Sequence, residues 1–305
     1  MKVFVTGASG FIGSHVIRNL LDAGHQVLGL VVPEDSLWRL QDVLGRITVL
    51  RGDLEHIESF SDGLRVWQPD ACIHLAWYAE PGTYLHSHQN LASLQASINL
   101  LKELFESGCE QFVGAGTCAE YEMKSELISE FDSAKPETLY AAAKLAFKII
   151  GEQLALQYNR KFAWGRIFYL YGPREDRRRL IPAAILKLIN SETFPASPGE
   201  QMRDFLHVAD VAAAFLAIVE KKASGTYNIC SAEPISVHVL LSTIEILLER
   251  SNLVLCGALP YREWEPMFIC GNNDRLKSIG WTPRYSIQSG LSDVINWWKM
   301  SLENK

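Results

Sequence analysis

The sequence lacks the long apolar runs and the excess of positive charge that mark several large classes of protein. No hydrophobic stretch in the 305 residues approaches the length of a membrane-spanning helix, which argues against an integral membrane protein. The net charge of −6 argues against a general nucleic-acid binder. No signal peptide precedes the first apolar segment, so the sequence predicts a cytoplasmic protein.

Patterns typical of metal sites and disulfides are also missing. The six cysteines include no C-x-x-C pair, and most lie in apolar segments, which predicts reduced core residues. His86 and His88 form an H-x-H pair, but no acidic residue or cysteine accompanies it as a further ligand. We therefore expect no metal. With 48% hydrophobic residues and no low-complexity linker, the chain is expected to form a large core and two lobes.

A glycine-rich turn near the start of the chain follows directly on a predicted strand over residues 2–6. Apolar residues spaced by about four predict a helix over residues 14–23. Between strand and helix, Gly7, Gly10 and Gly13 permit a tight turn, a close approach of phosphates and close helix packing. The turn predicts a dinucleotide site that Phe11 and Ile12 also contact, because a helix N-terminus binds a pyrophosphate. An ordinary tight βα turn is the alternative.

Strands and helices alternate along most of the chain. The further predicted strands cover residues 25–33, 47–50, 70–76, 111–116 and 162–169, with helical patterns between them. This alternation predicts an α/β fold with a doubly wound parallel sheet. Beyond residue 169, prolines interrupt the pattern. We expect a dinucleotide-binding domain over residues 1–168 and about 204–230. A smaller C-terminal substrate lobe is expected over about 169–203 and 231–305.

The end of the second predicted strand bears on the choice of cofactor. NAD-binding folds usually place an acidic residue there, which holds the adenine ribose hydroxyls. Val31 and Val32 occupy that place, and carboxylates follow only at Glu34 and Asp35. Arg39, just beyond, is suited to meet a 2′-phosphate. The sequence therefore favours NADP(H), with NAD(H) as the alternative.

A tyrosine and a lysine four residues apart form the candidate catalytic pair. Tyr140 and Lys144 share one face of a predicted helix. An ammonium group beside a phenol lowers its pKa from about 10, so the pair is suited to exchange a proton with an alcohol. Thr117 ends the fifth strand, where its hydroxyl can bind the same oxygen. Taken alone, the Tyr–Lys pair has a solvated helix face as its alternative.

The glycine turn, Thr117 and the Y-x-x-x-K pair together resemble the extended short-chain dehydrogenase/reductase family, over nearly the whole chain. Segments 74–76, 171–173, 203–211 and 280–283 resemble further motifs of that family. The resemblance implies a Rossmann-type fold, an NAD(P) cofactor and proton transfer by Thr117, Tyr140 and Lys144. It also implies a substrate that is a nucleotide-diphosphate sugar.

The resemblance and the positions of side chains suggest further site residues. Cofactor contacts are expected from Asp53, Leu54, Leu75 and Ala76, besides Arg39, Tyr140, Lys144 and the glycine turn. Substrate contacts are expected from Tyr78, Thr117, Tyr169, Arg179, Arg203 and Arg262. Arg203 and Arg262 are candidates for binding the substrate diphosphate. The alternative for Arg203 is an exposed arginine paired with Asp204, and the alternative for Arg262 is an ordinary surface arginine. Tyr169 stands where the family often has Asn, and Arg179 belongs to a basic cluster that also suits a solvated helix start.

Two residues after Thr117 narrow the chemistry. Sugar 4,6-dehydratases of the family follow the catalytic hydroxyl with Asp-Glu, whereas this chain has Cys118 and Ala119. This departure argues against a dehydratase. We favour a reductase of a nucleotide-linked 4-keto-6-deoxysugar, in deoxysugar biosynthesis, over a 4-epimerase with the same triad, because the second strand lacks the NAD-type acid and the C-terminal lobe is compact beside that of typical epimerases. A non-catalytic dinucleotide sensor is the third alternative, and the intact triad argues against it. The family also implies a homodimer through segments 91–105 and 141–158.

Overall fold

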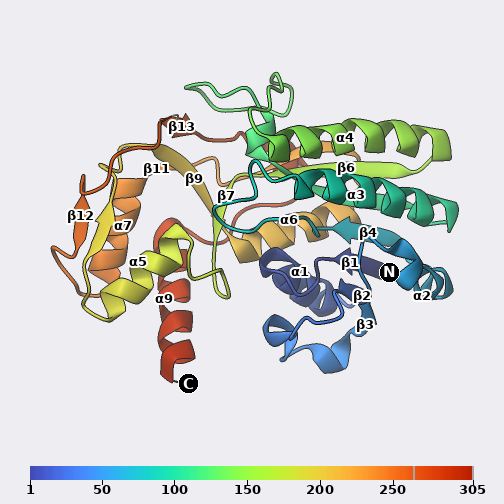
Figure 1. Ribbon diagram of the computed structural model, residues 1–305, viewed down its shortest axis with the longest axis horizontal. Coiled ribbons are helices and arrows are strands. Elements are labelled where there is room, and N and C mark those ends of the chain that lie inside the picture. Colours follow the sequence, from blue (N-terminus) through green and yellow to red (C-terminus); the bar gives the residue numbers. More distant parts are fainter. Residues whose placement is uncertain (264, 304–305) are drawn as a thin grey trace.

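The computed structural model describes residues 1–263 and 265–303, in which a large sheet lies between two layers of helices (Figure 1). Seven parallel strands follow the order β10-β6-β5-β4-β1-β2-β3. They are Lys2–Thr6 (β1), Gln26–Val31 (β2), Thr48–Arg51 (β3), Ala71–His74 (β4), Gln111–Thr117 (β5), Lys161–Ile167 (β6) and Gly225–Ile229 (β10). The strand order reverses between β1 and β4, and ligands bind outside the carboxyl ends of strands at such a point.

Helices cover both faces of this sheet. One face carries α2 (Ser61–Trp67), α3 (Gln89–Glu106) and α4 (Leu139–Tyr158), and the other carries α1 (Phe11–Asp22) and α6 (Val208–Glu220). Strand β1 is apolar at successive positions because Val3 and Val5 enter one core and Phe4 enters the other. The observed sheet confirms the predicted α/β class.

A smaller mixed sheet lies at one end of the molecule (Figure 1), with β9 at its centre. Its strands are Tyr169–Tyr171 (β7), Met202–His207 (β9), Pro234–Ser236 (β11) and Phe268–Ile269 (β13), and Phe194–Ala196 (β8) pairs separately with Val254–Cys256 (β12). Leu180–Ile189 (α5), Val237–Leu247 (α7) and Ile287–Glu303 (α9) pack together in this lobe, while Asp274–Ser278 (α8) lies by β10. Short 3₁₀ turns are Trp38–Leu40 (η1), Leu44–Arg46 (η2), Ile57–Ser59 (η3) and Cys118–Glu120 (η4).

Some element boundaries differ from those predicted. The strand predicted over residues 162–169 ends at Ile167, and Tyr169 begins β7, which pairs with β9 in the smaller sheet. The chain leaves the large sheet there, after Phe168 N donates to Ile229 O at 3.1 Å. Helix α1 begins at Phe11, three residues earlier than predicted. The expected domain boundary at residue 204 falls inside β9.

Within residues 1–263 and 265–303, no helix is long and apolar enough to cross a membrane, and no three His, Cys, Asp or Glu side chains are grouped as metal ligands. Five of the six cysteines are buried free thiols, and Cys256 is exposed.

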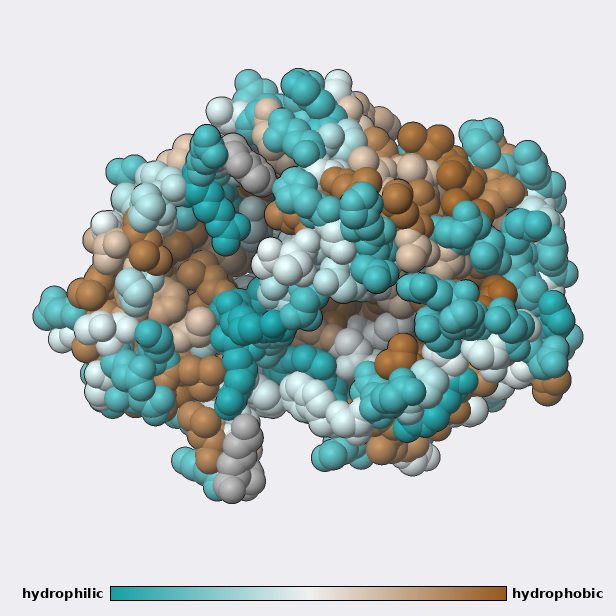
Figure 2. All heavy atoms as spheres, in the orientation of Figure 1, coloured by the Kyte–Doolittle hydropathy of each residue, from teal (hydrophilic) through white to brown (hydrophobic). Residues whose placement is uncertain are grey.

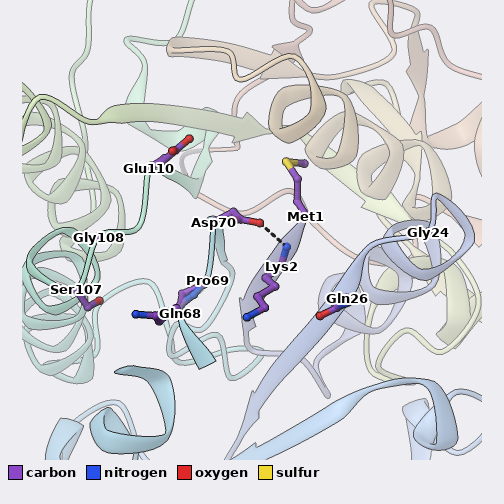
Figure 3. A pocket seen from close by; sticks show the side chains of 10 residues that line it. All are labelled: Met1, Lys2, Gly24, Gln26, Gln68, Pro69, Asp70, Ser107, Gly108 and Glu110. Carbon is purple, nitrogen blue, oxygen red and sulfur yellow. Dashed lines mark hydrogen bonds between the residues drawn. The ribbon is translucent and has the colours of Figure 1, made fainter. Parts of the chain in front are cut away.

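A cavity of about 560 Å³ lies at the amino ends of the strands (Figure 3). Met1, Lys2 and Gln26 line it, and Asp70 Oδ2 accepts a hydrogen bond from Lys2 N at 2.7 Å. This is the edge of the sheet opposite the glycine turn, so the cavity is separate from the candidate active site.

Candidate active site

The turn between β1 and α1 leaves no room for a side chain at Gly7 or at Gly13. A Cβ on Gly13 would lie 2.1 Å from Gly7 O, and one on Gly7, at φ +64°, would lie 2.8 Å from Ala76 N. The first helical hydrogen bond of α1 joins Ser14 N to Gly10 O at 3.0 Å, and among the described residues no side chain caps this helix. The N–H groups of residues 11–13 therefore precede the first helical bond, an arrangement that fits a dinucleotide pyrophosphate.

The end of β4 is held against this turn by a threonine from β1. Thr6 Oγ1 accepts hydrogen bonds from Leu75 N and Ala76 N, both at 3.2 Å. His74 is buried between Thr6 and Ser97, with Nδ1 at 2.8 Å from Thr6 Oγ1 and Nε2 at 2.9 Å from Ser97 Oγ. Leu75 and Ala76, predicted cofactor contacts, thus lie beside Gly7.

An acidic residue that the sequence analysis did not assign lies on the glycine turn. Ser9 Oγ donates to Asp35 Oδ2 at 2.5 Å, and Leu37 N donates to Asp35 Oδ1 at 2.9 Å. The chain turns back after β2 and brings this carboxylate against the glycine turn. The sequence had predicted no acidic residue at the end of this strand, because Val31 and Val32 stand there. The sequence pattern missed Asp35 because the acid comes four residues after the strand ends.

Arg39, the candidate contact for a 2′-phosphate, lies near Asp35 but is engaged elsewhere. Its guanidinium lies 4.2 Å from the ring centroid of Trp38, and its Nε donates to Arg174 O at 3.0 Å. Burial lowers the pKa of Arg39, and the charge of Asp35 opposes that shift. Arg39 therefore lies close to Asp35 and the loop after β7, and its cofactor contact stays a prediction.

Asp53 and Leu54 follow β3, where the adenine side of the site was predicted. Asp53 Oδ1 accepts from Glu55 N at 3.0 Å, so this carboxylate caps its own turn. Leu54 packs against the core beneath α2 and α3. Their contacts with a cofactor stay predictions.

The candidate catalytic residues come together from β5 and α4. Thr117 is the last residue of β5, and α4 is capped by the Thr138 hydroxyl, which accepts from Ala141 N at 3.2 Å. Lys144 is buried, and its Nζ donates to Ala115 O at 2.8 Å and lies 3.9 Å from the ring centroid of Trp77. Tyr140 lies one helical turn before Lys144, with its ring 5.9 Å from the ammonium.

Burial sets the protonation of this pair. It raises the pKa of Tyr140, which Tyr84 raises further, while an interaction with Thr117 opposes the shift. Burial also lowers the pKa of Lys144 to about 7, and the charge of Glu120 opposes that shift. The lowering of the Tyr140 pKa expected from the Lys144 ammonium is outweighed by desolvation of the phenolate, and the lowering expected from an oxidised nicotinamide stays a prediction. A phenol that keeps its proton at neutral pH is suited to donate it.

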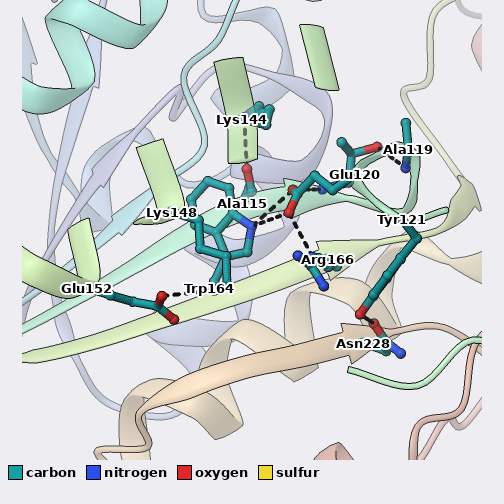
Figure 4. Close-up of polar contacts among 11 residues, drawn as sticks. Ala115, Ala119, Glu120, Tyr121, Lys144, Lys148, Glu152, Trp164, Arg166 and Asn228 are labelled. Atoms are coloured by element: carbon teal, nitrogen blue, oxygen red, sulfur yellow. Dashed lines mark hydrogen bonds and ion pairs between the residues drawn. The ribbon is translucent and has the colours of Figure 1, made fainter. Parts of the chain in front are cut away.

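A buried ion pair lies beneath the catalytic residues (Figure 4). Arg166 Nε donates to Glu120 Oε2 at 2.7 Å, and Thr117 N donates to Glu120 Oε1 at 2.9 Å. Trp164 Nε1 also donates to this carboxylate, at 3.0 Å to Oε1. The sequence analysis missed Glu120, although Thr-x-x-Glu is the signature of a capping box.

A second tyrosine, absent from the predicted set, links Tyr140 to the basic cluster. Tyr84 meets the ring of Tyr140 edge-on at 4.9 Å, and the Arg179 guanidinium lies 5.7 Å from the Tyr84 ring. Tyr78 lies six residues before Tyr84 and is partly buried. Its hydroxyl lies 3.1 Å from that of Thr83. Arg179 is thus near the catalytic pair, whereas the contacts of Tyr78 do not reach it in the described structure.

The candidate diphosphate arginine is buried in β9. Arg203 Nη2 donates to Glu265 Oε1 at 2.5 Å, and its guanidinium lies 5.3 Å from the Tyr169 ring. The alternative of an exposed arginine paired with Asp204 was therefore wrong. Asp204 instead accepts from Ser231 N at 2.6 Å. Arg262 is exposed and lies in the turn that carries Glu265, whose N donates to Arg262 O at 3.2 Å.

Comparison with known proteins agrees with this geometry. The model of the NAD dependent epimerase/dehydratase family matches residues 3–230, about three quarters of the chain. The chain belongs to this family. Its members are NAD(P)-dependent enzymes of the extended short-chain dehydrogenase/reductase type, and their Gly-rich turn and Y-x-x-x-K pair are the features described above. The family assignment establishes an enzyme that uses a dinucleotide.

Named relatives align along nearly the whole length of this family member. It is 31% identical to the uncharacterized UDP-glucose epimerase YtcB of Bacillus subtilis, over 97% of each chain. It is 26% identical to dTDP-6-deoxy-L-talose 4-dehydrogenase (NAD(+)) of Aggregatibacter actinomycetemcomitans, over 89% of this chain and 99% of that one. The crystal structure of UDP-glucose 4-epimerase from Thermotoga maritima superimposes with a TM-score of 0.90 at 22% identity, over 99% and 100% of the two chains. This last likeness shows the shared fold.

Proposed function

We propose that this protein reduces the 4-keto group of a nucleotide-linked 4-keto-6-deoxysugar. The observation that carries the proposal is the segment after Thr117. Burial raises the pKa of Cys118 to about 12, and Ala119 has no acid or base. The next carboxylate, Glu120, is fully buried and bound to Arg166. The segment therefore offers the substrate no acid–base pair of the kind that expels water in a dehydratase.

The described geometry suggests a role for each catalytic side chain. The bound dinucleotide supplies the hydride. Tyr140 keeps its phenolic proton at neutral pH and donates it to O4 of the sugar, while the Thr117 hydroxyl orients that oxygen. The buried Lys144 ammonium stabilises the tyrosinate that forms. Arg179 lies near Tyr140 by way of Tyr84, and Arg203 lies beside Tyr169. We assign both arginines and Tyr169 to substrate binding, together with Arg262 and Tyr78.

The name of one relative supports chemistry at C4. The talose 4-dehydrogenase from Aggregatibacter actinomycetemcomitans carries in its name both a 6-deoxysugar nucleotide and a redox reaction at position 4. A 4-epimerase with the same triad is the second candidate, since the 31% identical relative is named an epimerase.

The loop after β7 also favours the epimerase alternative, in which the cofactor is retained through each cycle. His15 Nε2 lies 3.0 Å from Pro173 O, and Arg39 Nε donates to Arg174 O. Arg178 Nη1 donates to Glu80 Oε1 at 2.6 Å, which joins this loop to the one after β4. Contacts of this kind around the dinucleotide site suit a cofactor that dissociates slowly.

We further propose NAD(H) as the preferred cofactor, in place of the NADP(H) that the sequence favoured. A carboxylate beside the glycine turn binds ribose hydroxyls and repels a 2′-phosphate, and Asp35 stands there. The name of the talose 4-dehydrogenase likewise includes NAD(+). Arg39 remains the residue that would accept a 2′-phosphate.

We also propose that two copies pair through α3 and α4. Leu91, Ile149 and Leu156 are 50%, 52% and 75% exposed on these helices. Figure 2 shows hydrophobic residues gathered over this side of the molecule. Contiguous apolar surface on two adjacent helices is typical of a protein–protein interface.

Product analysis tests the reaction. The purified protein is incubated with a nucleotide 4-keto-6-deoxyhexose and NADH or NADPH, and we expect one dinucleotide oxidised per sugar reduced. Tyr140→Phe should lower turnover by about 10²-fold or more while keeping cofactor affinity, because the proton donor is lost. Tyr158→Phe, at the far end of α4, is the matched control. Interconversion of two saturated nucleotide sugars without net oxidation of dinucleotide would establish the epimerase instead.

A further inference from the structure

Glu120 is a buried carboxylate held by three hydrogen-bond donors. It is fully buried, and its two oxygens accept hydrogen bonds from the side chains of Arg166 and Trp164 and from the main chain of Thr117 (Figure 4). The reciprocal half of this capping box is the Thr117 hydroxyl, which accepts from Ala119 N at 3.2 Å. Both the position of the Thr117 backbone and the direction of its side chain thus depend on η4.

The neighbouring strand is shaped to hold this carboxylate. A Cβ on Gly116 would lie 2.2 Å from Trp164 Nε1 and 2.6 Å from Glu120 Oε1. Trp164 lies on the other side of the same network, with its ring 5.9 Å from Lys144 Nζ. Trp164 therefore bonds Glu120 through its Nε1 and also lies close to the Lys144 ammonium.

Several titratable groups surround Lys144 in the described structure. They are His74 on β4, Tyr84 in the loop before α3, Cys118 and Glu120 on η4, Tyr140 on α4 and, behind Glu120, Tyr121 and Arg166. Burial lowers the pKa of His74 to about 3 and raises those of Tyr140 and Cys118, so these groups are uncharged at neutral pH. Among the residues described, Glu120 is the carboxylate whose charge acts on Lys144.

We propose that Glu120 is a positioning residue of the active site, which fixes the main chain of Thr117 and supplies the buried negative charge that favours the ammonium form of Lys144. The proposal rests on the proposed function for its consequence in turnover, but the charge of Lys144 is measured without any substrate. Glu120 does not touch the reacting atoms, because its oxygens are all bound to Arg166, Trp164 and Thr117 N. Arg166 pairs with the carboxylate and offsets part of the cost of burying its charge.

Direct titration of Lys144 tests the charge. Protein labelled with ¹³C at lysine Cε is titrated by NMR, and Lys144→Met assigns the resonance. In Glu120→Gln, we expect the pKa of Lys144 to fall by about one unit from its wild-type value, since the opposing charge is lost. Glutamine keeps an oxygen that accepts from Thr117 N. Glu122→Gln, an exposed partner of Lys135 two residues along, is the control and should leave Lys144 unchanged.

Glu120→Gln leaves the Arg166 guanidinium buried without its partner, and an unpaired buried charge destabilises the fold. A second variant avoids this problem. Glu120→Gln with Arg166→Gln removes both charges and can keep a hydrogen bond between the two side chains. In this variant the pKa of Lys144 should still fall, though by less than in the single variant, because the loss of the Arg166 charge acts in the opposite direction. Folded Glu120 variants that leave the Lys144 titration unmoved would overturn the proposal. If the wild-type enzyme is active, the alkaline limb of the pH profile of kcat should lie at lower pH in Glu120→Gln than in the wild type, by the same shift as the pKa of Lys144. An enzyme inactive on the keto sugar would refute the proposed function and leave the NMR result standing.

Discussion

The active-site residues have their charges set by burial more than by their chemical type. Tyr140 and Lys144 lie one turn apart, yet the phenol is held in its neutral form and the amine has a pKa of about 7. Desolvation disfavours the charged form of each group, so the two shifts run in opposite directions. At neutral pH the phenol therefore carries its proton and the amine lies close to its titration point.

Asp35 provides a test of cofactor choice at a single residue. In Asp35→Asn, we expect affinity for NADH to fall by about tenfold or more, because a charge-assisted hydrogen bond to the ribose is lost. Affinity for NADPH should rise, since the repulsion of its 2′-phosphate is removed. Fluorescence titration with both reduced dinucleotides measures the change.

The neighbouring Glu34 supplies the control for that measurement. Glu34→Gln removes the same charge one residue earlier on an exposed side chain and should leave both affinities nearly unchanged. Arg39→Ala completes the set: weakened NADPH with unchanged NADH would assign the 2′-phosphate to Arg39. If Asp35→Asn altered neither dinucleotide, the carboxylate would have no part in the choice.

The positions of side chains that a strand end or a helical spacing fixes could be predicted from the sequence. The positions of side chains that a turn brings back toward the site could not. The closeness of Thr117, Tyr140 and Lys144 could be predicted because a strand end and an i, i+4 pair fix the directions of their side chains, while their catalytic roles stay predictions. Asp35 and Tyr84 reach the site through turns, and no periodicity describes a turn of that kind. Arg203 was found by its motif, but its partner Glu265 lies 62 residues further along the chain.

At the level of elements, the glycine turn joins three pieces of secondary structure at contact distance. In Gly13→Ala, the new Cβ would lie 2.1 Å from Gly7 O, and a backbone oxygen cannot move aside as a flexible side chain does. We expect α1 to shift off β1, with at least about a tenfold loss of dinucleotide affinity and a lower Tm. Calorimetric titration and thermal unfolding give the two values.

Gly45→Ala is the matched control, because a Cβ there meets nothing within 4 Å in the described structure. It should leave affinity and Tm close to those of the wild type. Unchanged binding in Gly13→Ala would mean that the turn can widen, and the close packing of α1 on β1 would then not be needed for the cofactor.

The elements of the first half were predictable because each one is periodic and buried. Strands β1, β4 and β5 read as continuous apolar runs, since helices cover both faces of the sheet. The second half has β7, β8, β11 and β12, each of three residues, too short for any pattern to repeat. Their pairing with β9 or with each other depends on contacts distant in sequence, which explains why the predicted sixth strand ran on into β7.

At the scale of the whole molecule, the doubly wound sheet buries titratable groups that then link stability to pH. Burial lowers the pKa of His15 to about 4 and that of His74 to about 3. Both histidines are neutral in the fold and take up a proton on unfolding below about 6.5, so each removes stability as pH falls. Burial raises the pKa of Glu175 to about 8, and this group acts in the opposite direction between about 4.5 and 8.

Between about pH 6.5 and 4.5, unfolding leads His15 and His74 to take up a proton each and Glu175 to release one. From these three groups, the unfolded chain therefore binds about one proton more than the folded chain. The free energy of unfolding should therefore fall by at most about 1.4 kcal/mol for each pH unit over this range, since the raised pKa of Asp204 acts in the same direction as that of Glu175. Urea unfolding at several pH values measures the slope. Glu175→Gln should make the fall steeper, because it removes the opposing group, whereas His15→Gln should flatten it while retaining a donor to Pro173 O. A stability that stayed level or rose on acidification would show that these histidines do not remain neutral inside the fold.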